Sequence, residues 1–187
     1  MRLLAYCVMP NHFHLALWPV DDGDLSRWMH WLLTTHARRY LAHYHGTGHV
    51  WQGRFKAFPI EEDEHLRVVL RYIERNPLRA SLVERAEQWP WSSLCPGGEK
   101  PLLDPGPAPR GARWVEAVNA AMTEAECESI RTSIRRNRPL GTEAWVRRTA
   151  EKLGLESSLR APGRPPGTTD NRSMTLKAGK YPRSPEL

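Results

Sequence analysis

MPNHFHLAL, residues 9–17, carries two histidines that flank a single phenylalanine. Apolar residues alternate with the histidines, and a period of two on a β-strand puts the imidazoles of His12 and His14 on one face. Two neighbouring imidazoles can form a metal site or a phosphate site. A half-buried strand whose polar face carries histidines would show the same pattern. The interpretation therefore depends on chemical groups elsewhere in the chain.

The composition limits the class of protein. The chain has 187 residues, of which 40% are hydrophobic, enough for one domain with a core, and 16 are prolines, which indicates segments outside that core. No run approaches the roughly 18 apolar residues of a membrane span, and the start lacks the pattern of a signal peptide. The three cysteines have no metal-binding spacing, as is typical of a reducing compartment. We therefore expect a cytoplasmic protein with no membrane partner.

Positive charge is concentrated near the end of the chain. The net charge is +6, and residues 131–187 hold 13 lysines and arginines against 5 acidic residues. All eight histidines lie at or before His65. A basic end beside a histidine-rich front favours a protein that holds a polyanion and acts on it, with nucleic acid as the first candidate. Mildly basic proteins of other kinds share this balance, so charge alone is weak support.

Hydrophobic periodicity predicts an α+β arrangement in the first 95 residues. Apolar residues recur with a period of two in the strands and with helical spacing in the helices. The expected order is strand, strand, helix, strand and helix, over residues 3–8, 12–18, 25–44, 50–60 and 61–80. Leu66, Val69, Leu70 and Ile73 form the expected buried stripe of the last helix.

Several polar residues of the first helix and the third expected strand are candidates for contact with phosphate. They share a position away from the apolar side of their element: Arg38, Arg39, Gln52, Arg54 and Lys56. Cations that alternate with aromatic rings suit a single-stranded nucleic acid, because cations meet phosphates while rings stack on bases. The solvent-exposed face of an ordinary helix or edge strand would look much the same.

A tyrosine and an amide follow on the last of these helices. Tyr72 lies off the apolar stripe, and Asn76, four residues further on, would be its neighbour on one helical face. Pro77 makes the direction of the amide less certain, because a residue before proline is disfavoured in helical geometry. A tyrosine in such a position is most often a residue at the rim of the core. Its combination with the histidine pair favours a shared site.

Three strings of this chain resemble one known family. The strings are YCVMPNHFHLAL, WQGRFKA and RYIERNPLRASLVERAEQWPWSS, which follow one another over residues 5–94. They are similar to the REP-associated tyrosine transposases, a branch of the single-tyrosine HUH transposases. A looser similarity continues in NRPLGTEAWVRRTAEKLGLE and PGRPPG. The resemblance implies a ferredoxin-like antiparallel sheet with helices on one face. It also implies REP-like palindromic hairpins of single-stranded DNA as the substrate.

The resemblance assigns roles by position. It makes Tyr72 the nucleophile and His12, His14 and Asn76 the metal ligands. Nitrogen and oxygen donors without a thiolate suit Mg²⁺ or Mn²⁺ better than structural zinc. Attack by the phenol on a scissile phosphate would give a 5′-phosphotyrosine and a free 3′-hydroxyl. The covalent link would conserve the energy needed for rejoining.

Two further arginines complete the expected DNA contacts. Arg79 follows the tyrosine on the same helix, and Arg164 lies in the element PGRPPG, where an arginine can contact phosphate near the foot of a hairpin. A tail that only increases solubility would also be basic. Two other functions stay open. One is a hairpin-binding protein or decayed transposase without catalysis, and the other is a metal-dependent hydrolase whose histidines activate water.

Four parts are expected along the chain. Residues 1–95 form the catalytic domain, 96–110 a linker rich in proline and glycine, 111–160 a small helical module, and 161–187 a basic disordered tail. Family members usually have several dozen residues before the strand that leads into the histidine pair. The resemblance therefore implies a domain without its first strand and helix, which would expose a sheet edge. The sequence leaves open a monomer or a homodimer.

Overall fold

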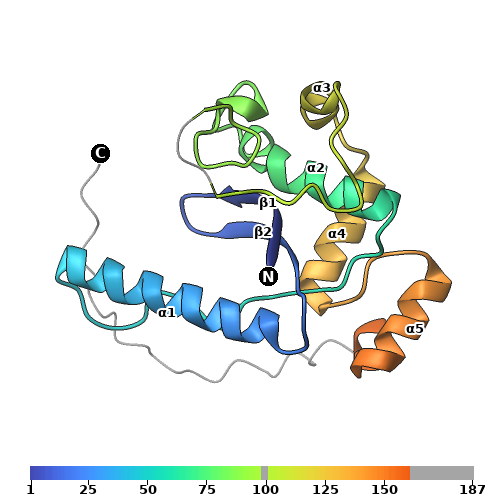
Figure 1. Cartoon of the computed structure of the whole chain (residues 1–187), viewed down its shortest axis with the longest axis horizontal. Coiled ribbons are helices and arrows are strands. Elements are labelled where there is room, and N and C mark those ends of the chain that lie inside the picture. Colours follow the sequence, from blue (N-terminus) through green and yellow to red (C-terminus); the bar gives the residue numbers. More distant parts are fainter. Residues whose placement is uncertain (98–100, 161–187) are drawn as a thin grey trace, which may run out of the picture.

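The computed structural model describes residues 1–97 and 101–160 (Figure 1). This part contains an antiparallel pair of strands and five α-helices: β1 (Arg2–Val8), β2 (Phe13–Trp18), α1 (Asp24–Tyr44), α2 (Glu64–Arg79), α3 (Trp114–Asn119), α4 (Glu124–Arg136) and α5 (Glu143–Leu153). The α+β class with an antiparallel sheet is thereby confirmed. No helix in the described ranges combines the length and apolar character of a membrane span. The expected disordered tail over 161–187 lies outside the described residues.

The two strands form a hairpin that fixes the position of the histidines. Cys7 of β1 pairs with His14 of β2, and the Met9 N–H donates to the His12 carbonyl across 2.8 Å to close the connection. The other edge of β1 is covered by a later segment, because the Val8 N–H donates to the Trp91 carbonyl across 2.9 Å. β1 is therefore the inner strand and β2 an outer one.

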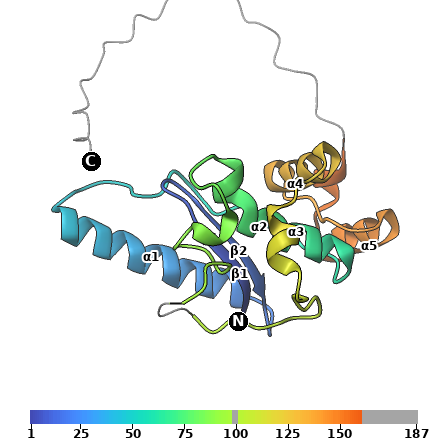
Figure 2. The same cartoon turned by 90° about the horizontal axis from the view of Figure 1, so that it is seen from above.

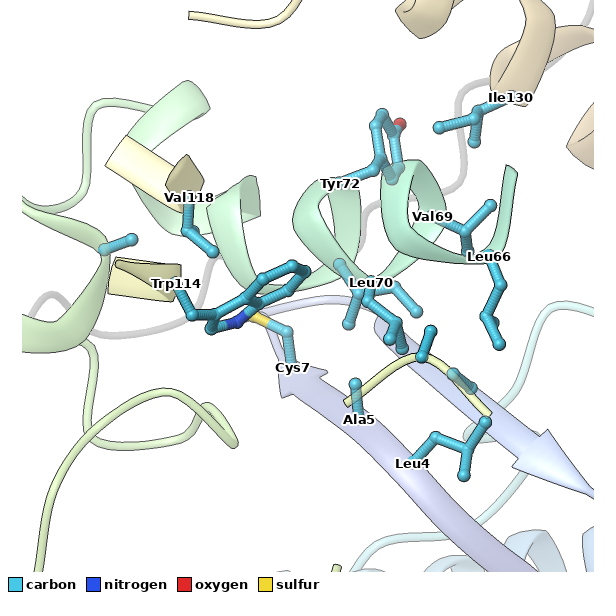
Figure 3. Packing of buried hydrophobic residues seen from close by; sticks show 14 of the residues in the cluster. Leu4, Ala5, Cys7, Leu66, Val69, Leu70, Tyr72, Trp114, Val118 and Ile130 are labelled. Carbon is cyan, nitrogen blue, oxygen red and sulfur yellow. The ribbon is translucent and has the colours of Figure 1, made fainter. Parts of the chain in front are cut away.

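Helix α2 provides the other half of the core. The Asp63 side chain caps its start by accepting from the His65 N–H across 2.8 Å. All four residues of the predicted stripe are at most 5% exposed: Leu66, Val69, Leu70 and Ile73. Figure 3 shows Leu66 and Leu70 directed toward Leu4 and Ala5 of β1. Burial of this stripe against β1 holds α2 on the sheet.

The third strand predicted over residues 50–60 is wrong. Within the described chain this segment makes a single isolated bridge, between Ile60 and Leu140. Alternation along a sequence sets only which side chains share a face, whereas a strand needs a neighbour for its backbone groups. The segment is instead held by side chains: the Trp51 indole N–H donates to the Leu33 carbonyl across 3.2 Å. Its ring also meets the Phe13 ring edge-on, at 5.5 Å between centroids.

The first long helix is largely exposed. Among the residues of α1, Met29 is the one that is fully buried. The helix extends past the ends of both strands, as the two cartoon views agree (Figure 1, Figure 2). Gly23 occupies the capping position, and Asp24, inside the first turn, accepts from the Asp21 N–H across 2.9 Å.

The second half of the chain is helical. Helices α3, α4 and α5 lie within residues 111–160, where the sequence predicted a small helical module. At the start of α4 the Glu126 N–H donates to the Thr123 hydroxyl and the Thr123 N–H to the Glu126 carboxylate, at 3.2 and 2.7 Å. This pair of bonds is a capping box. Residues of β1, α2, α3 and α4 belong to one hydrophobic cluster.

Residues 101–110 run along β1. The Asp104 N–H donates to the Leu3 carbonyl and the Arg110 guanidinium to the Leu4 carbonyl, both across 2.8 Å. The two contacts hold this proline-rich segment against the sheet. The proposed division of the chain into a domain, a linker and a module stays a prediction.

Candidate metal and nucleophile site

Two histidines meet at the start of β2. The ring centroids of His12 and His14 lie 5.0 Å apart, with the rings nearly perpendicular. The His12 Nδ1 donates to the Asn11 side-chain oxygen across 2.7 Å, so its Nε2 is left for another partner. Among the buried nitrogen and oxygen atoms of side chains in the described part of the chain, the His14 Nε2 lacks a hydrogen-bond partner. Such atoms are rare, so this nitrogen is a candidate ligand atom.

Both imidazoles are held in their neutral form. Burial, the nearby His12 and Arg79 lower the pKa of His14 to about 4, from 6.5. Burial and Arg79 also lower the pKa of His12. A neutral imidazole is the form that binds a metal ion. The histidine pair is therefore ready to accept a cation at neutral pH without losing protons.

Tyr72 reaches the histidines from α2. Its ring centroid lies 5.8 Å from that of His14, and the residue is 6% exposed. The phenol projects from α2 toward the side of α4 that carries Ile130 (Figure 3). It lines a pocket of about 190 Å³ between these helices, together with Arg75, Arg79 and Arg131. The structure thus brings a phenol, two imidazoles and several guanidinium groups into one region, as the sequence predicted for Tyr72 and the histidines.

The structure places Asn76 beside Tyr72 on α2, where its helical spacing predicted it. Helix α2 continues through Pro77 to Arg79, so Asn76 keeps helical geometry and is fully buried. Its Nδ2 donates to the Tyr72 carbonyl across 2.8 Å, and its Oδ1 accepts from the Arg79 guanidinium across 2.8 Å. The side chain thereby lies along its own helix beside Tyr72. The amide oxygen is the atom that could bind a cation, and Arg79 now occupies it.

The proposed DNA contacts fall into two groups. Five residues lie exposed on α1 or on the segment that follows it: Arg38, Arg39, Gln52, Arg54 and Lys56. Arg79 is also exposed but belongs to the histidine and tyrosine site, with its guanidinium carbon 5.6 Å from the Tyr72 ring centroid. Arg164 lies outside the described residues. In the described part of the chain, none of the five exposed residues lines the pocket beside Tyr72.

Sequence reasoning missed two features of this region. The first is the bond between Arg79 and Asn76, although their spacing of three residues on a helix is a signal that could have indicated it. The second is Arg131 of α4, whose place beside Tyr72 depends on packing between distant segments. No local pattern marks such a contact.

A second group of possible metal ligands lies at the start of α2. Oxygen or nitrogen atoms of Glu61, Asp63 and His65 all lie within 4.8 Å of one another. Each carboxylate already has a structural role. Glu61 accepts from the Thr142 N–H across 2.6 Å at the start of α5, and Asp63 caps α2 and binds His65. We therefore interpret this group as a pair of helix caps.

Comparison with known proteins supports the resemblance. Residues 1–76 match the family described as "Transposase IS200 like". The chain is 29% identical over 93 residues to the REP-associated tyrosine transposase of Escherichia coli (strain K12), a match covering 48% of this chain and 52% of that protein. It is 31% identical over 102 residues to a Haemophilus influenzae protein whose description names the same kind of transposase, covering 49% of this chain and 57% of the relative.

Residues 1–76 are therefore similar to the IS200-like transposases, and the predicted similarity to REP-associated tyrosine transposases is confirmed. The match spans about half the length of each curated relative. No solved structure matches. The matched residues 1–76 include both histidines, Tyr72 and Asn76, so the candidate site lies within the shared part.

Proposed function

We propose that this chain cuts and rejoins single-stranded DNA at palindromic hairpins through a covalent 5′-phosphotyrosine on Tyr72. The observation that carries the proposal is the meeting of Tyr72 with the histidine pair, at 5.8 Å between the Tyr72 and His14 centroids. The two groups come from α2 and β2, which are separated by the whole of α1 in the sequence. A phenol beside neutral imidazoles and guanidinium groups suits phosphoryl transfer, because that reaction depends on positioning and on stabilising negative charge.

The residues present fit a divalent cation. His12 and His14 would offer Nε2 atoms and Asn76 its Oδ1, a nitrogen and oxygen set that suits Mg²⁺ or Mn²⁺. The orphaned His14 Nε2 and the lowered pKa values of both histidines support this assignment. When bound, such a cation would neutralise charge that develops on the scissile phosphate.

The chain's own residues account for the chemical step. The Tyr72 oxygen attacks phosphorus and loses its proton to solvent, while the bond from phosphorus to the 3′-oxygen breaks and that oxygen gains a proton. The product is a protein joined to the 5′-phosphate and a DNA end with a free 3′-hydroxyl. Arg79, on the pocket that Tyr72 lines, supplies positive charge for the phosphate. Reversal with another 3′-hydroxyl rejoins the strand.

The surface of α1 and the following segment supports DNA as the partner. Residues 25–60 contain five lysines and arginines and no aspartate or glutamate. Four of the five belong to the exposed group at Arg38, Arg39, Arg54 and Lys56. A surface with one sign of charge attracts a polyanion over the whole of its length. We further propose that the protein acts in the cytoplasm, as a monomer or a homodimer.

The test is a gel assay with the purified chain, a labelled single-stranded hairpin oligonucleotide and Mn²⁺. DNA that migrates with protein under denaturing conditions is the expected result, lost in Tyr72→Phe and after addition of a chelator. Tyr44→Phe, a change to an exposed phenol of α1, is the matched control and should keep the adduct.

Two results would replace the proposal with one of the alternatives. Hairpin binding without any adduct, and with equal affinity in Tyr72→Phe, would indicate a binding protein. Cleavage that persists in Tyr72→Phe and needs His14 would indicate a hydrolase whose histidines activate water.

A further inference from the structure

Arg79 contacts two other residues of the candidate site, Asn76 and Tyr72. Its guanidinium donates to the Asn76 Oδ1 across 2.8 Å and lies 5.6 Å from the Tyr72 ring centroid. Its charge also acts on both histidines, since it contributes to the lowered pKa of each. In the described part of the chain no carboxylate forms an ion pair with it. Arg79 is thus a positive charge without an ion-pair partner that contacts Asn76 and Tyr72.

The position of Arg79 disfavours the binding of a divalent cation in the protein without DNA. The amide oxygen that a divalent ion would need is already accepting a hydrogen bond from a guanidinium. The ion would also lie beside a fixed positive charge, and like charges at close range repel. A phosphate anion changes both conditions, because a guanidinium binds phosphate strongly and the anion offsets the repulsion.

We propose that Arg79 is a positioning residue that makes metal binding depend on DNA. In the free protein it holds the Asn76 oxygen and disfavours a divalent cation. When a phosphate of single-stranded DNA enters, the guanidinium turns to the phosphate and releases the amide oxygen to the ion. The inference rests on the proposed function, because it assumes the histidine pair as the metal site. Linkage then requires that Mn²⁺ strengthens DNA binding by the same factor as DNA strengthens Mn²⁺ binding.

The size of the effect follows from the charges. A unit charge next to a divalent ion, screened by a dielectric close to that of water, changes the affinity by about tenfold. Removal of the Arg79 charge should therefore tighten Mn²⁺ binding to the free protein by about this factor. It should also reduce the gain in Mn²⁺ affinity that DNA produces.

The experiment is calorimetric titration of the full chain with Mn²⁺, alone and with a saturating single-stranded hairpin oligonucleotide. We expect Arg79→Gln to bind Mn²⁺ about tenfold more tightly than the wild type without DNA, and to lose most of the increase caused by DNA. Arg79→Lys retains the charge and should resemble the wild type. Arg148→Gln removes an exposed charge of α5 and is the matched control, with unchanged values.

Different results identify which assumption fails. Equal or weaker Mn²⁺ binding in Arg79→Gln, with binding that still requires His14, would overturn the role of Arg79 and leave the proposed function intact. Mn²⁺ binding that is absent, or that persists unchanged in His14→Gln, would overturn both. Circular dichroism of each variant checks that the fold is retained.

Discussion

Replacement of Glu74 by alanine should destabilise the protein more than any change at its surface. Glu74 of α2 is completely buried. Its Oε1 accepts from the Ser93 hydroxyl across 2.6 Å and from the Arg110 guanidinium across 2.8 Å, and its Oε2 accepts from the Trp114 indole N–H across 2.6 Å. One carboxylate therefore joins α2 to Ser93, to Arg110 and to Trp114 of α3.

The expected loss follows from these contacts. Removing one partner of a buried ion pair costs about 3–5 kcal/mol, because the other charge is left without compensation. Each stranded donor adds roughly 1–3 kcal/mol when it stays buried. The terms share one carboxylate and do not add fully. We therefore expect a loss of about 4 kcal/mol in the free energy of unfolding for Glu74→Ala, and about 2 kcal/mol for Glu74→Gln, which keeps one acceptor.

The assay is urea unfolding followed by tryptophan fluorescence, with the free energy extrapolated to water. Glu84→Ala removes an exposed carboxylate and serves as the matched control, with an expected change within about 0.5 kcal/mol. A loss below about 1 kcal/mol for Glu74→Ala would refute the reasoning, since the carboxylate could not then be the buried link between these segments.

Two further predictions concern the site and its DNA contacts. The pKa of His14 is about 4 in the folded protein against 6.5 for the free group, so the unfolded chain binds more protons between these values and stability falls as pH drops through this range. The wild type should therefore lose more unfolding free energy than His14→Gln as the pH falls, by at most about 3 kcal/mol near pH 4. Parallel curves of unfolding free energy against pH for the two proteins would contradict this prediction. Arg54→Gln and Lys56→Gln should each lower the slope of log affinity against log salt by about 0.7, through loss of one phosphate contact. Slopes equal to those of the wild type and of Arg148→Gln would exclude such contacts.

Local signals predicted the elements that depend on local chemistry. The alternation around His12 and His14 predicted β2, and helical spacing predicted α1 and α2. These signals act within one turn or one strand. The sequence therefore sufficed for the class of fold and for the histidine and tyrosine positions.

Contacts between distant segments were not predictable in this way. The alternation in residues 50–60 could not show that these residues have no partner strand in the described part of the chain. Pro77 left the direction of the Asn76 amide open. In the structure the Asn76 amide bonds back to the Tyr72 carbonyl, and buried packing carries α2 on to Arg79. The Glu74 network likewise depends on segments up to 40 residues away, a range beyond any periodic pattern.

The central claim is that Tyr72 becomes joined to the 5′-phosphate of a cut strand. The most direct test treats a single-stranded hairpin oligonucleotide, labelled at its 3′ end, with the chain and Mn²⁺, then digests the protein and maps the modified peptide by mass spectrometry. The account predicts that the 3′ label stays with protein and that a nucleotide is attached through its 5′-phosphate to Tyr72. Attachment at another residue, linkage through a 3′-phosphate, or cleavage with no modified peptide would contradict it.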